Sequence, residues 1–274
     1  SIEFSGNLSA DIVLPTTNLM TSGVAYTAGG APVSVATKLT DLDQITGLDD
    51  GDSISITGFD KAGTVVNTAY DIVAAATDTL GDLLGAISTA YSGSTAKIVN
   101  GQLQLEDDAS GYSRTDMLLS YVPNAGGTFE LPEYFRTLNP GSEGMQNVDV
   151  EVFDSQGIAH VVSASFVKTG TANTWDMVMT SITGGIDQLT DRRISGITFL
   201  TDGSYGGMGG TPPDSQTFTI AFANDPGTPR TIAMDFGTIG ENDGITLTGG
   251  NTTVSARGQD GYASGQLTAL SASR

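Results

Sequence analysis

The stretch NVDVEVFDSQGIAHVVSASFVK, residues 147–168, decides the fold. Its first half alternates valine with Asp149 and Glu151, which is the period-2 pattern of a strand with one buried face. DSQG follows at 154–157, with aspartate and glycine at the first and fourth positions of a type I turn. The chain then returns with apolar side chains at alternate positions, which predicts an antiparallel hairpin; these side chains are Val162, Ala164 and Phe166.

Segments on the C-terminal side of this hairpin have the same period. Apolar residues alternate with small or polar ones over 175–179, 197–199, 217–222 and 232–236. Turn sequences rich in Asp, Asn, Gly and Pro separate these segments. The predicted fold class is therefore mainly β, with a β-sandwich or barrel-like domain.

Residues 41–121 follow a different order. Two strand patterns precede a helix predicted near 78–91 and two follow it, which gives an inserted β-β-α-β-β module. Thr77 or Asp78 can cap this helix, and glycines within it weaken it. Its single apolar stripe must therefore pack on a sheet; the stripe is Leu80, Leu83, Leu84, Ile87 and Tyr91.

Two stretches at 15–38 and 122–147, rich in glycine, flank this module. Such composition is typical of linkers, so we expect the module to be inserted into a larger β domain. The predicted organisation has three parts. They are a discontinuous β domain of residues 1–20 plus 140–255, an inserted outer domain of residues 21–139, and a return segment of residues 256–274.

Composition and charge exclude several classes of function. The chain has 274 residues and a formal net charge of -20, so we expect no nucleic acid and no membrane among its partners. It has no cysteine and one histidine, which excludes disulfide frameworks, thiol nucleophiles and nearly every zinc site. It starts at Ser1 without a signal-peptide pattern, so we expect a fragment or a processed product.

The side chains that could carry chemistry have simpler structural interpretations. His160 could act as a general base, but no nucleophile motif accompanies it, and we expect a half-exposed strand residue beside a turn. Trp175 could stack on a sugar ring, but it shares the alternation of Met177 and Met179. We therefore predict that Trp175 lies in the core.

The acidic and glycine-rich clusters also resemble ordinary loops. The aspartates within 41–52 lack the residue order of an EF-hand, as does the acidic run 106–108. Both are interpreted as solvated turns, and the sequence leaves open whether they bind calcium. The stretch 206–210 lacks the lysine of a phosphate-binding loop and is interpreted as a flexible loop.

Five blocks resemble the bacterial flagellar hook protein and occur in the order of that family. The resemblance covers 1–10 and 148–267, and the segment between them is longer than in short family members. Part of that segment looks like the small modules inserted into flagellins and other axial proteins. The five blocks are FSGNL (4–8), VFDSQGIAH (152–160), FVKT leading to NTW (166–175), ITFLTDG (197–203) and QDGYASGQL (259–267).

The resemblance implies a structural protein, not an enzyme, with no catalytic site and no cofactor. Its partners would be copies of itself in a helical tube, together with the hook-associated and rod proteins of the flagellum. The tube is the curved universal joint that transmits motor torque to the filament. The implied location is the extracellular flagellar hook, reached by export without a cleaved signal peptide. The terminal heptad helices of the family are absent here, so the chain resembles the outer, surface portion of a subunit.

One short motif of the tail is a candidate interdomain joint. Gly261 and Gly265 flank Tyr262, so the backbone can turn tightly while the ring packs.

Two other classes of function remain open at this point. One is a bacterial cell-surface β module of the adhesin or surface-layer type that binds glycans, and the other is a β-sandwich hydrolase that uses His160.

Overall fold

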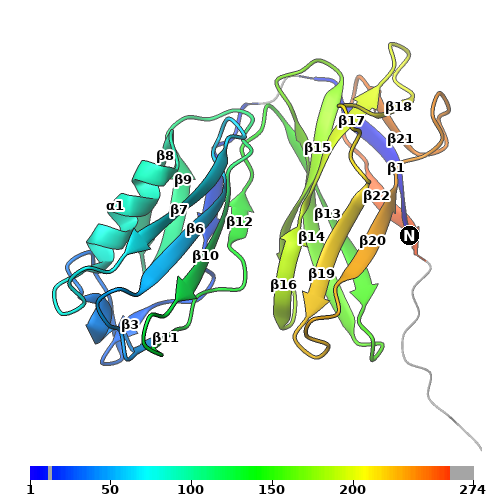
Figure 1. Cartoon of the computed structure of the whole chain (residues 1–274). Coiled ribbons are helices and arrows are strands. Elements are labelled where there is room, and N and C mark those ends of the chain that lie inside the picture. Colours follow the sequence, from blue (N-terminus) through cyan, green and yellow to red (C-terminus); the bar gives the residue numbers. More distant parts are fainter. Residues whose placement is uncertain (12–13, 260–274) are drawn as a thin grey trace, which may run out of the picture.

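A computed structural model of the chain describes residues 1–11 and 14–259. These residues form two lobes, each built around its own hydrophobic core (Figure 1). The hairpin lobe comprises residues 1–11 and 140–259, and the helix lobe comprises residues 14–139. Strands dominate both lobes, so the predicted mainly β fold class is confirmed.

Two sheets enclose the core of the hairpin lobe. One has the order β13-β14-β15-β17-β18, and the other has the order β16-β19-β20-β1-β21, with β22 also paired to β1. Strand β1 is parallel to β20 and β21, which brings the start of the chain between strands from its end. The bounds are β1 Ile2–Ser9, β13 Met145–Phe153, β14 Ala159–Lys168, β15 Thr174–Ile182, β16 Ile186–Asp191, β17 Arg193–Phe199, β18 Tyr205–Met208, β19 Thr217–Phe222, β20 Arg230–Asp235, β21 Ile245–Thr248 and β22 Ser255–Gln259.

The hairpin predicted at 147–168 is confirmed as β13 and β14. The two strands pair antiparallel from Met145 opposite Val167 to Phe153 opposite Ala159, without a register shift. Valines of β13 and alternate residues of β14 point into the core, where Phe166 meets Phe4 from β1 edge to face at 5.6 Å. The alternating apolar residues of β13 and β14 therefore form one buried face of the hairpin, and β1, the first strand of the chain, packs against that face.

Among the described residues, the helix lobe contains three small sheets, a hairpin, one α-helix and one short 3-10 helix. The sheets have the orders β12-β2-β9-β8, β10-β6-β7 and β11-β5, and β3 pairs with β4. Helix α1 lies on the outer side of the lobe in Figure 1. The bounds are β2 Leu19–Thr21, β3 Thr27–Ala28, β4 Ala31–Pro32, the 3-10 helix Leu39–Asp41, β5 Ile45–Thr46, β6 Ser53–Phe59, β7 Val65–Asp71, α1 Leu80–Ala90, β8 Ser94–Val99, β9 Gln102–Asp107, β10 Asp116–Val122, β11 Thr128–Phe129 and β12 Arg136–Asn139.

Helix α1 has the predicted apolar face but a different N-cap. Thr79, not Thr77 or Asp78, caps the helix, because its side chain accepts a hydrogen bond from Asp82 N while the Asp82 carboxylate accepts from Thr79 N. Gly81 lets the loop before the helix approach closely, since its N–H donates to Val35 O at 2.8 Å. The predicted stripe is buried, including the C-cap residue Tyr91.

Both stretches interpreted as linkers contain strands of the helix lobe. Residues 15–38 include β2, β3 and β4, and residues 122–147 include β11 and β12. Strand β2 is only three residues long, yet it lies between β9 and β12 and places Met20 in the core. The period-2 pattern is not visible in strands this short, so composition alone gave the wrong interpretation.

Two further loop predictions are wrong. The stretch 206–210 is not a flexible loop, because β18 (Tyr205–Met208) pairs antiparallel with β17. Asp107 is not a solvated turn residue, because it ends β9 and is buried. Strand β22 was not predicted either, and it pairs antiparallel with β1. Among the described residues, no helix is long and apolar enough to cross a membrane.

Candidate functional site: the junction between the lobes

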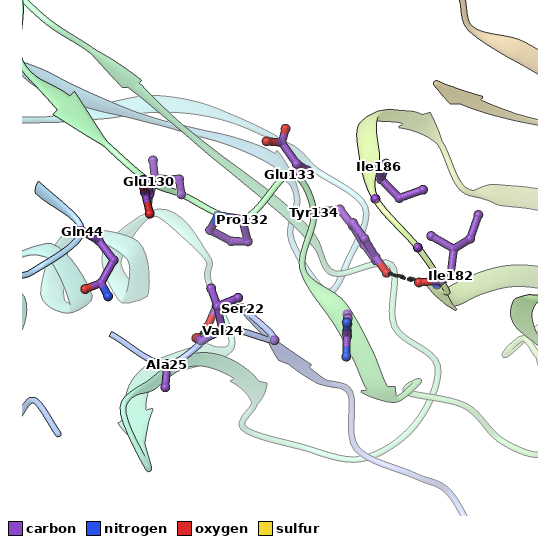
Figure 2. Close-up of a pocket in the computed structure, with 15 residues that line it drawn as sticks. Ser22, Val24, Ala25, Gln44, Glu130, Pro132, Glu133, Tyr134, Ile182 and Ile186 are labelled. Atoms are coloured by element: carbon purple, nitrogen blue, oxygen red, sulfur yellow. Dashed lines mark hydrogen bonds between the residues drawn. The ribbon is translucent and has the colours of Figure 1, made fainter. Parts of the chain in front are cut away.

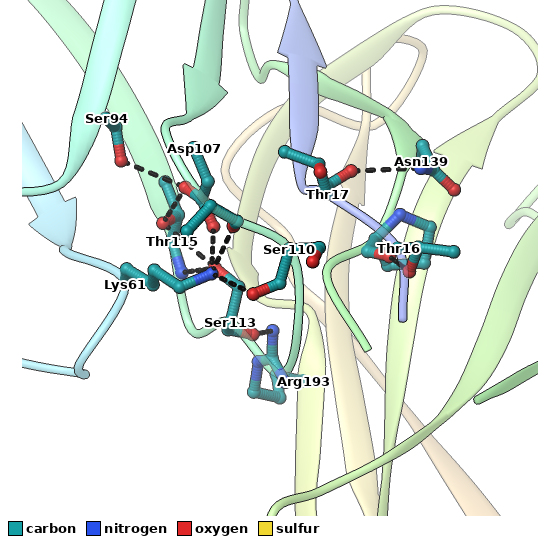
Figure 3. A network of polar contacts seen from close by, with 12 residues as sticks. Thr16, Thr17, Lys61, Ser94, Asp107, Ser110, Ser113, Thr115, Asn139 and Arg193 are labelled. Atoms are coloured by element: carbon teal, nitrogen blue, oxygen red, sulfur yellow. Dashed lines mark hydrogen bonds and ion pairs between the residues drawn. The ribbon is translucent and has the colours of Figure 1, made fainter. Parts of the chain in front are cut away.

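Two passages of the chain connect the lobes and lie side by side. Thr16 and Ser142 form an isolated antiparallel bridge, in which Thr16 N donates to Ser142 O at 2.9 Å. The Thr16 hydroxyl donates to Pro140 O at 2.6 Å, and Asn139 Nδ2 donates to Thr17 O at 2.9 Å (Figure 3). Ser142 is fully buried, so the bridge bond is shielded from water, and together with the two part-buried side-chain bonds it holds the two passages together.

Arg192 reaches from the hairpin lobe into the helix lobe. Its guanidinium donates to Phe135 O at 2.6 Å and forms an ion pair with Asp116 Oδ1 at 2.5 Å. The Arg192 side chain is 7% exposed, so its bond to the Phe135 carbonyl lies largely out of water, whereas the Asp116 side chain is 37% exposed and its end of the ion pair is solvated. Arginine suits this position because its planar group can donate to a carbonyl and a carboxylate at once.

Arg193 makes a second contact across the junction. Its Nη1 pairs with Asp176 Oδ2 within the hairpin lobe at 2.9 Å, and its Nη2 donates to Ser113 O of the helix lobe at 2.9 Å. Tyr112 adds to this contact, because its ring lies 5.8 Å from the guanidinium and its hydroxyl donates to Asp176 Oδ2 at 2.5 Å. Burial raises the pKa of the Tyr112 hydroxyl, as does the charge of Asp176, so the phenol stays a donor.

A buried carboxylate behind this contact positions the loop that carries Tyr112 and Ser113. Asp107 accepts hydrogen bonds from Ser94 Oγ at 2.9 Å and from Thr115 Oγ1 at 2.7 Å. Lys61 pairs with the same carboxylate at 3.3 Å (Figure 3). The acidic run interpreted as a solvated turn is therefore partly a structural anchor of the junction.

An open cleft of about 560 Å³ separates the lobes beside these contacts. Figure 2 shows side chains of both lobes along it, including Val24 and Glu133 on one side and Ile186 on the other. The Tyr134 hydroxyl spans the cleft, accepting from Ile182 N at 3.0 Å and donating to Ile182 O at 3.3 Å. Burial raises the pKa of the Glu133 carboxyl, and the negative charge of Asp187 raises it further.

The residues considered for catalysis and sugar binding lie in the hairpin lobe. His160 is buried at 7% exposed, not half exposed as predicted. Both of its ring nitrogens contact oxygen atoms, those of Asp154 and of the Thr183 carbonyl. Trp175 is buried at 2% exposed, as predicted, so its ring offers no platform to a sugar.

The aspartates of 41–52 do not gather into one site. Asp52 is buried and accepts from Asp49 N at 2.8 Å and Asn124 N at 2.7 Å, and the Asp49 bond leads the effects that lower its pKa. Asp43 accepts from Thr27 Oγ1, Gly29 N and Gly30 N, which lower its pKa in the same way. Within 1–11 and 14–259, no three carboxylate or histidine side chains are grouped as a metal site requires.

The candidate joint in the tail cannot be placed. Tyr262, Gly261 and Gly265 lie outside the described residues. Arg192 and Arg193, which make the observed contacts between lobes, were missed by the sequence reasoning. The available signal was their adjacency, since a chain with 11 lysines and arginines against 31 acidic residues has few places with two neighbouring cations.

Comparison with known proteins adds two findings. Residues 124–262, which are 139 of the 274 residues and so just over half of the chain, match the family described as flagellar basal body protein FlaE D2 domain. A crystal structure of the Helicobacter pylori flagellar hook protein FlgE2 is similar at 12% identity, over 96% of this chain and 60% of that chain, with a TM-score of 0.26. This chain therefore spans less than two thirds of that protein. No curated protein matches the chain.

Proposed function

The chain belongs to the flagellar FlaE D2 domain family and is a structural part of a flagellar hook protein, and from this premise we propose that it forms the outer portion of a self-assembling hook subunit. The match over 124–262 is the observation that carries the proposal. The location follows the family and is the flagellum. Partners are other copies of the subunit in a helical tube and, at its two ends, the rod and hook-associated proteins.

The two lobes act in this proposal as domains of one subunit. The family match covers residues 140–259 of the hairpin lobe together with the last strands of the helix lobe, and the rest of the helix lobe is an insertion that projects outward. The separate cores and the two adjacent chain passages support this division. Contacts between subunits are heterologous, so copies add head to tail and build an open tube rather than a closed ring.

The junction makes each subunit a firm unit while the tube bends. In a curved tube, subunits on the inner side lie closer together than those on the outer side. Bending then requires neighbouring subunits to slide past one another. This sliding is easier when the two lobes within each subunit keep a fixed arrangement. Arg192 and Arg193 provide that internal coupling. The strongly negative surface, at a formal net charge of -20, keeps facing outer surfaces from adhering.

Localisation tests this function directly. An antibody raised against this chain should label the hook in immunoelectron micrographs of intact flagella, and deletion of the coding sequence should remove hooks and motility. The chain by itself should remain monomeric at neutral pH and moderate salt in light scattering. Label along the filament or the cell surface instead of the hook would contradict the proposal.

A further inference from the structure

The hairpin between β8 and β9 turns on the one Asn-Gly pair of the sequence, Asn100-Gly101. Val99 lies opposite Gln102, so the connection has two residues, and both have positive φ values, 52° for Asn100 and 78° for Gly101. These values are those of a type I′ turn, for which Asn-Gly is the preferred sequence. The fold alone therefore accounts for this pair, and its chemistry adds a second property.

Asn100 and Gly101 carry the two groups that react in an intramolecular deamidation. The Asn100 side chain is exposed, and no hydrogen bond engages its amide among the residues that the structure describes. Within the same part of the chain, the Gly101 N–H donates no hydrogen bond, because the strand pairing ends at Val99 and Gln102. Glycine has no Cβ to shield this nitrogen, so it can approach Cγ of Asn100 once the turn opens.

The Asp-Gly pairs of the described residues, which could form the same cyclic imide, lack this freedom. In each pair the carboxylate accepts a hydrogen bond from a backbone N–H, and the aspartates are Asp50, Asp202 and Asp243. Gly51 N also donates to Ile72 O at 2.8 Å. Gly203 N donates to Leu200 O at 3.0 Å. The fold therefore restrains these pairs and leaves Asn100-Gly101 free to react.

We propose that Asn100 is a site of spontaneous deamidation in the folded chain. Gly101 N forms a bond to Cγ of Asn100, the bond from Cγ to Nδ2 breaks, and the amide nitrogen leaves as ammonia with the proton that Gly101 N gives up. The resulting cyclic imide then takes up one water. Opening at Cγ gives aspartate, whereas opening at the main-chain carbonyl carbon gives isoaspartate. Water is the sole co-reactant, and nothing is oxidised or reduced.

The isoaspartate product disturbs a contact between this turn and one wall of the cleft. Gly101 O accepts from Tyr26 N at 2.8 Å, and a Cβ on Gly101 would lie 2.8 Å from Tyr26 O, so the two backbones touch. Tyr26 is buried in the core of the helix lobe, and residues 22–25 before it line the cleft. Isoaspartate carries the main chain through Cβ and Cγ and so lengthens a two-residue connection. We therefore expect it to loosen the bond to Tyr26.

Peptide mapping by mass spectrometry measures the reaction. Trypsin should release residues 98–114, because Lys97 and Arg114 delimit them, and Asn100 is the single asparagine of that peptide. After incubation of the native chain in mildly alkaline buffer, the peptide should gain the mass difference between an amide and an acid and should contain isoaspartate. The rate should lie within about tenfold of the rate in urea, since opening the turn costs about one hydrogen bond.

The matched control is Asn100→Gln, whose longer side chain would have to close a larger ring and should leave the peptide unchanged over the same period. Isoaspartate should also be absent from the tryptic peptides 39–61, 194–230 and 231–257, which contain the Asp-Gly pairs. A native rate below the tenfold range would show that the fold protects Asn100 and would overturn the proposal. Isoaspartate that forms first at an Asp-Gly pair would do the same.

Amide hydrogen exchange tests the effect on the cleft wall. In the isoaspartate form, separated by chromatography, the protection factor of the Tyr26 amide should fall several-fold. The Ser22 amide donates to Leu103 O at 2.8 Å, farther along β9, and should keep its protection. Asn100→Asp adds the charge without lengthening the main chain and should leave Tyr26 protected. Equal protection of Tyr26 in the isoaspartate and unmodified chains would refute the link between the turn and the cleft.

Discussion

Replacing Arg192 by methionine is the sharpest test of how the lobes are coupled. The variant Arg192→Met keeps most of the volume of the arginine stem but loses its charge and its donors to Phe135 O and Asp116. A hydrogen bond from a charged donor contributes about 1.5–3 kcal/mol to stability. The Asp116 side chain is 37% exposed, so water screens that ion pair and it adds only about 0–1 kcal/mol. We therefore expect the free energy of unfolding to fall by about 2–3 kcal/mol.

The assay uses a probe in each lobe. Trp175, the single tryptophan, reports the hairpin lobe by fluorescence, while circular dichroism at the helix band reports α1 in the helix lobe. In urea, the two probes should give one coincident transition in the wild type. In Arg192→Met the transitions should separate, with the midpoint of the less stable lobe lowered.

A surface arginine provides the control. Arg136, on β12, is exposed, so Arg136→Met should change stability by no more than about 0.5 kcal/mol and leave the probes coincident. The reasoning would be refuted if Arg192→Met behaved like Arg136→Met. In that case the two chain passages alone would couple the lobes.

Four other results are expected. Thr79→Ala should destabilise the helix lobe by about 1 kcal/mol in urea denaturation, whereas Thr77→Ala should have little effect, because only Thr79 caps α1. Replacing residues 18–139 by a short Gly-Ser joint should leave the hairpin lobe folded with a cooperative melt, since no fully buried residue of its core is removed and only Tyr134 packs against that core from the removed part; a non-cooperative melt would count against separate domains. Stability should fall as pH drops below about 4, because Asp52 has a lowered pKa and its contribution is lost on protonation; the wild type should lose more stability than Asp52→Asn between pH 7 and 3. In the full-length subunit, Tyr262→Ala should leave export intact but give straight, short or unstable hooks in electron micrographs, and normal hooks would show that the ring is not a joint.

The sequence predicted the elements in which local pattern and burial agree. The hairpin of β13 and β14 has nine residues or more in each strand. Its connecting turn has aspartate and glycine at the first and fourth positions, which is typical of a type I turn. Helix α1 was recognised because its apolar residues repeat over almost three turns. Its cap was misplaced by one or two positions, because threonine and aspartate at 77–79 are all good caps and only the fold selects among them.

The junction could not be predicted, because its contacts join residues distant in sequence. Strand β12 is four residues long, and its place in the sheet depends on pairing with a strand far earlier in the chain, since Thr21 of β2 lies opposite Arg136, 115 positions later. Asp107 appeared to belong to a solvated acidic run, yet the positions of Ser94 and Thr115 bury it. Charge patterns indicate polarity, but the partner of a buried charge is set by tertiary structure.

The bridge between Thr16 and Ser142 makes the helix lobe exchangeable. Residues paired in an antiparallel bridge have Cα atoms about 4.5–5.5 Å apart, so the helix lobe leaves and re-enters the hairpin lobe at nearly one point. Any folded unit whose own ends lie that close could be grafted at this point without disturbing the strands beneath. Related subunits could therefore diverge freely in the part that faces the surroundings, and a foreign domain or an epitope could be displayed there at regular intervals on a polymer.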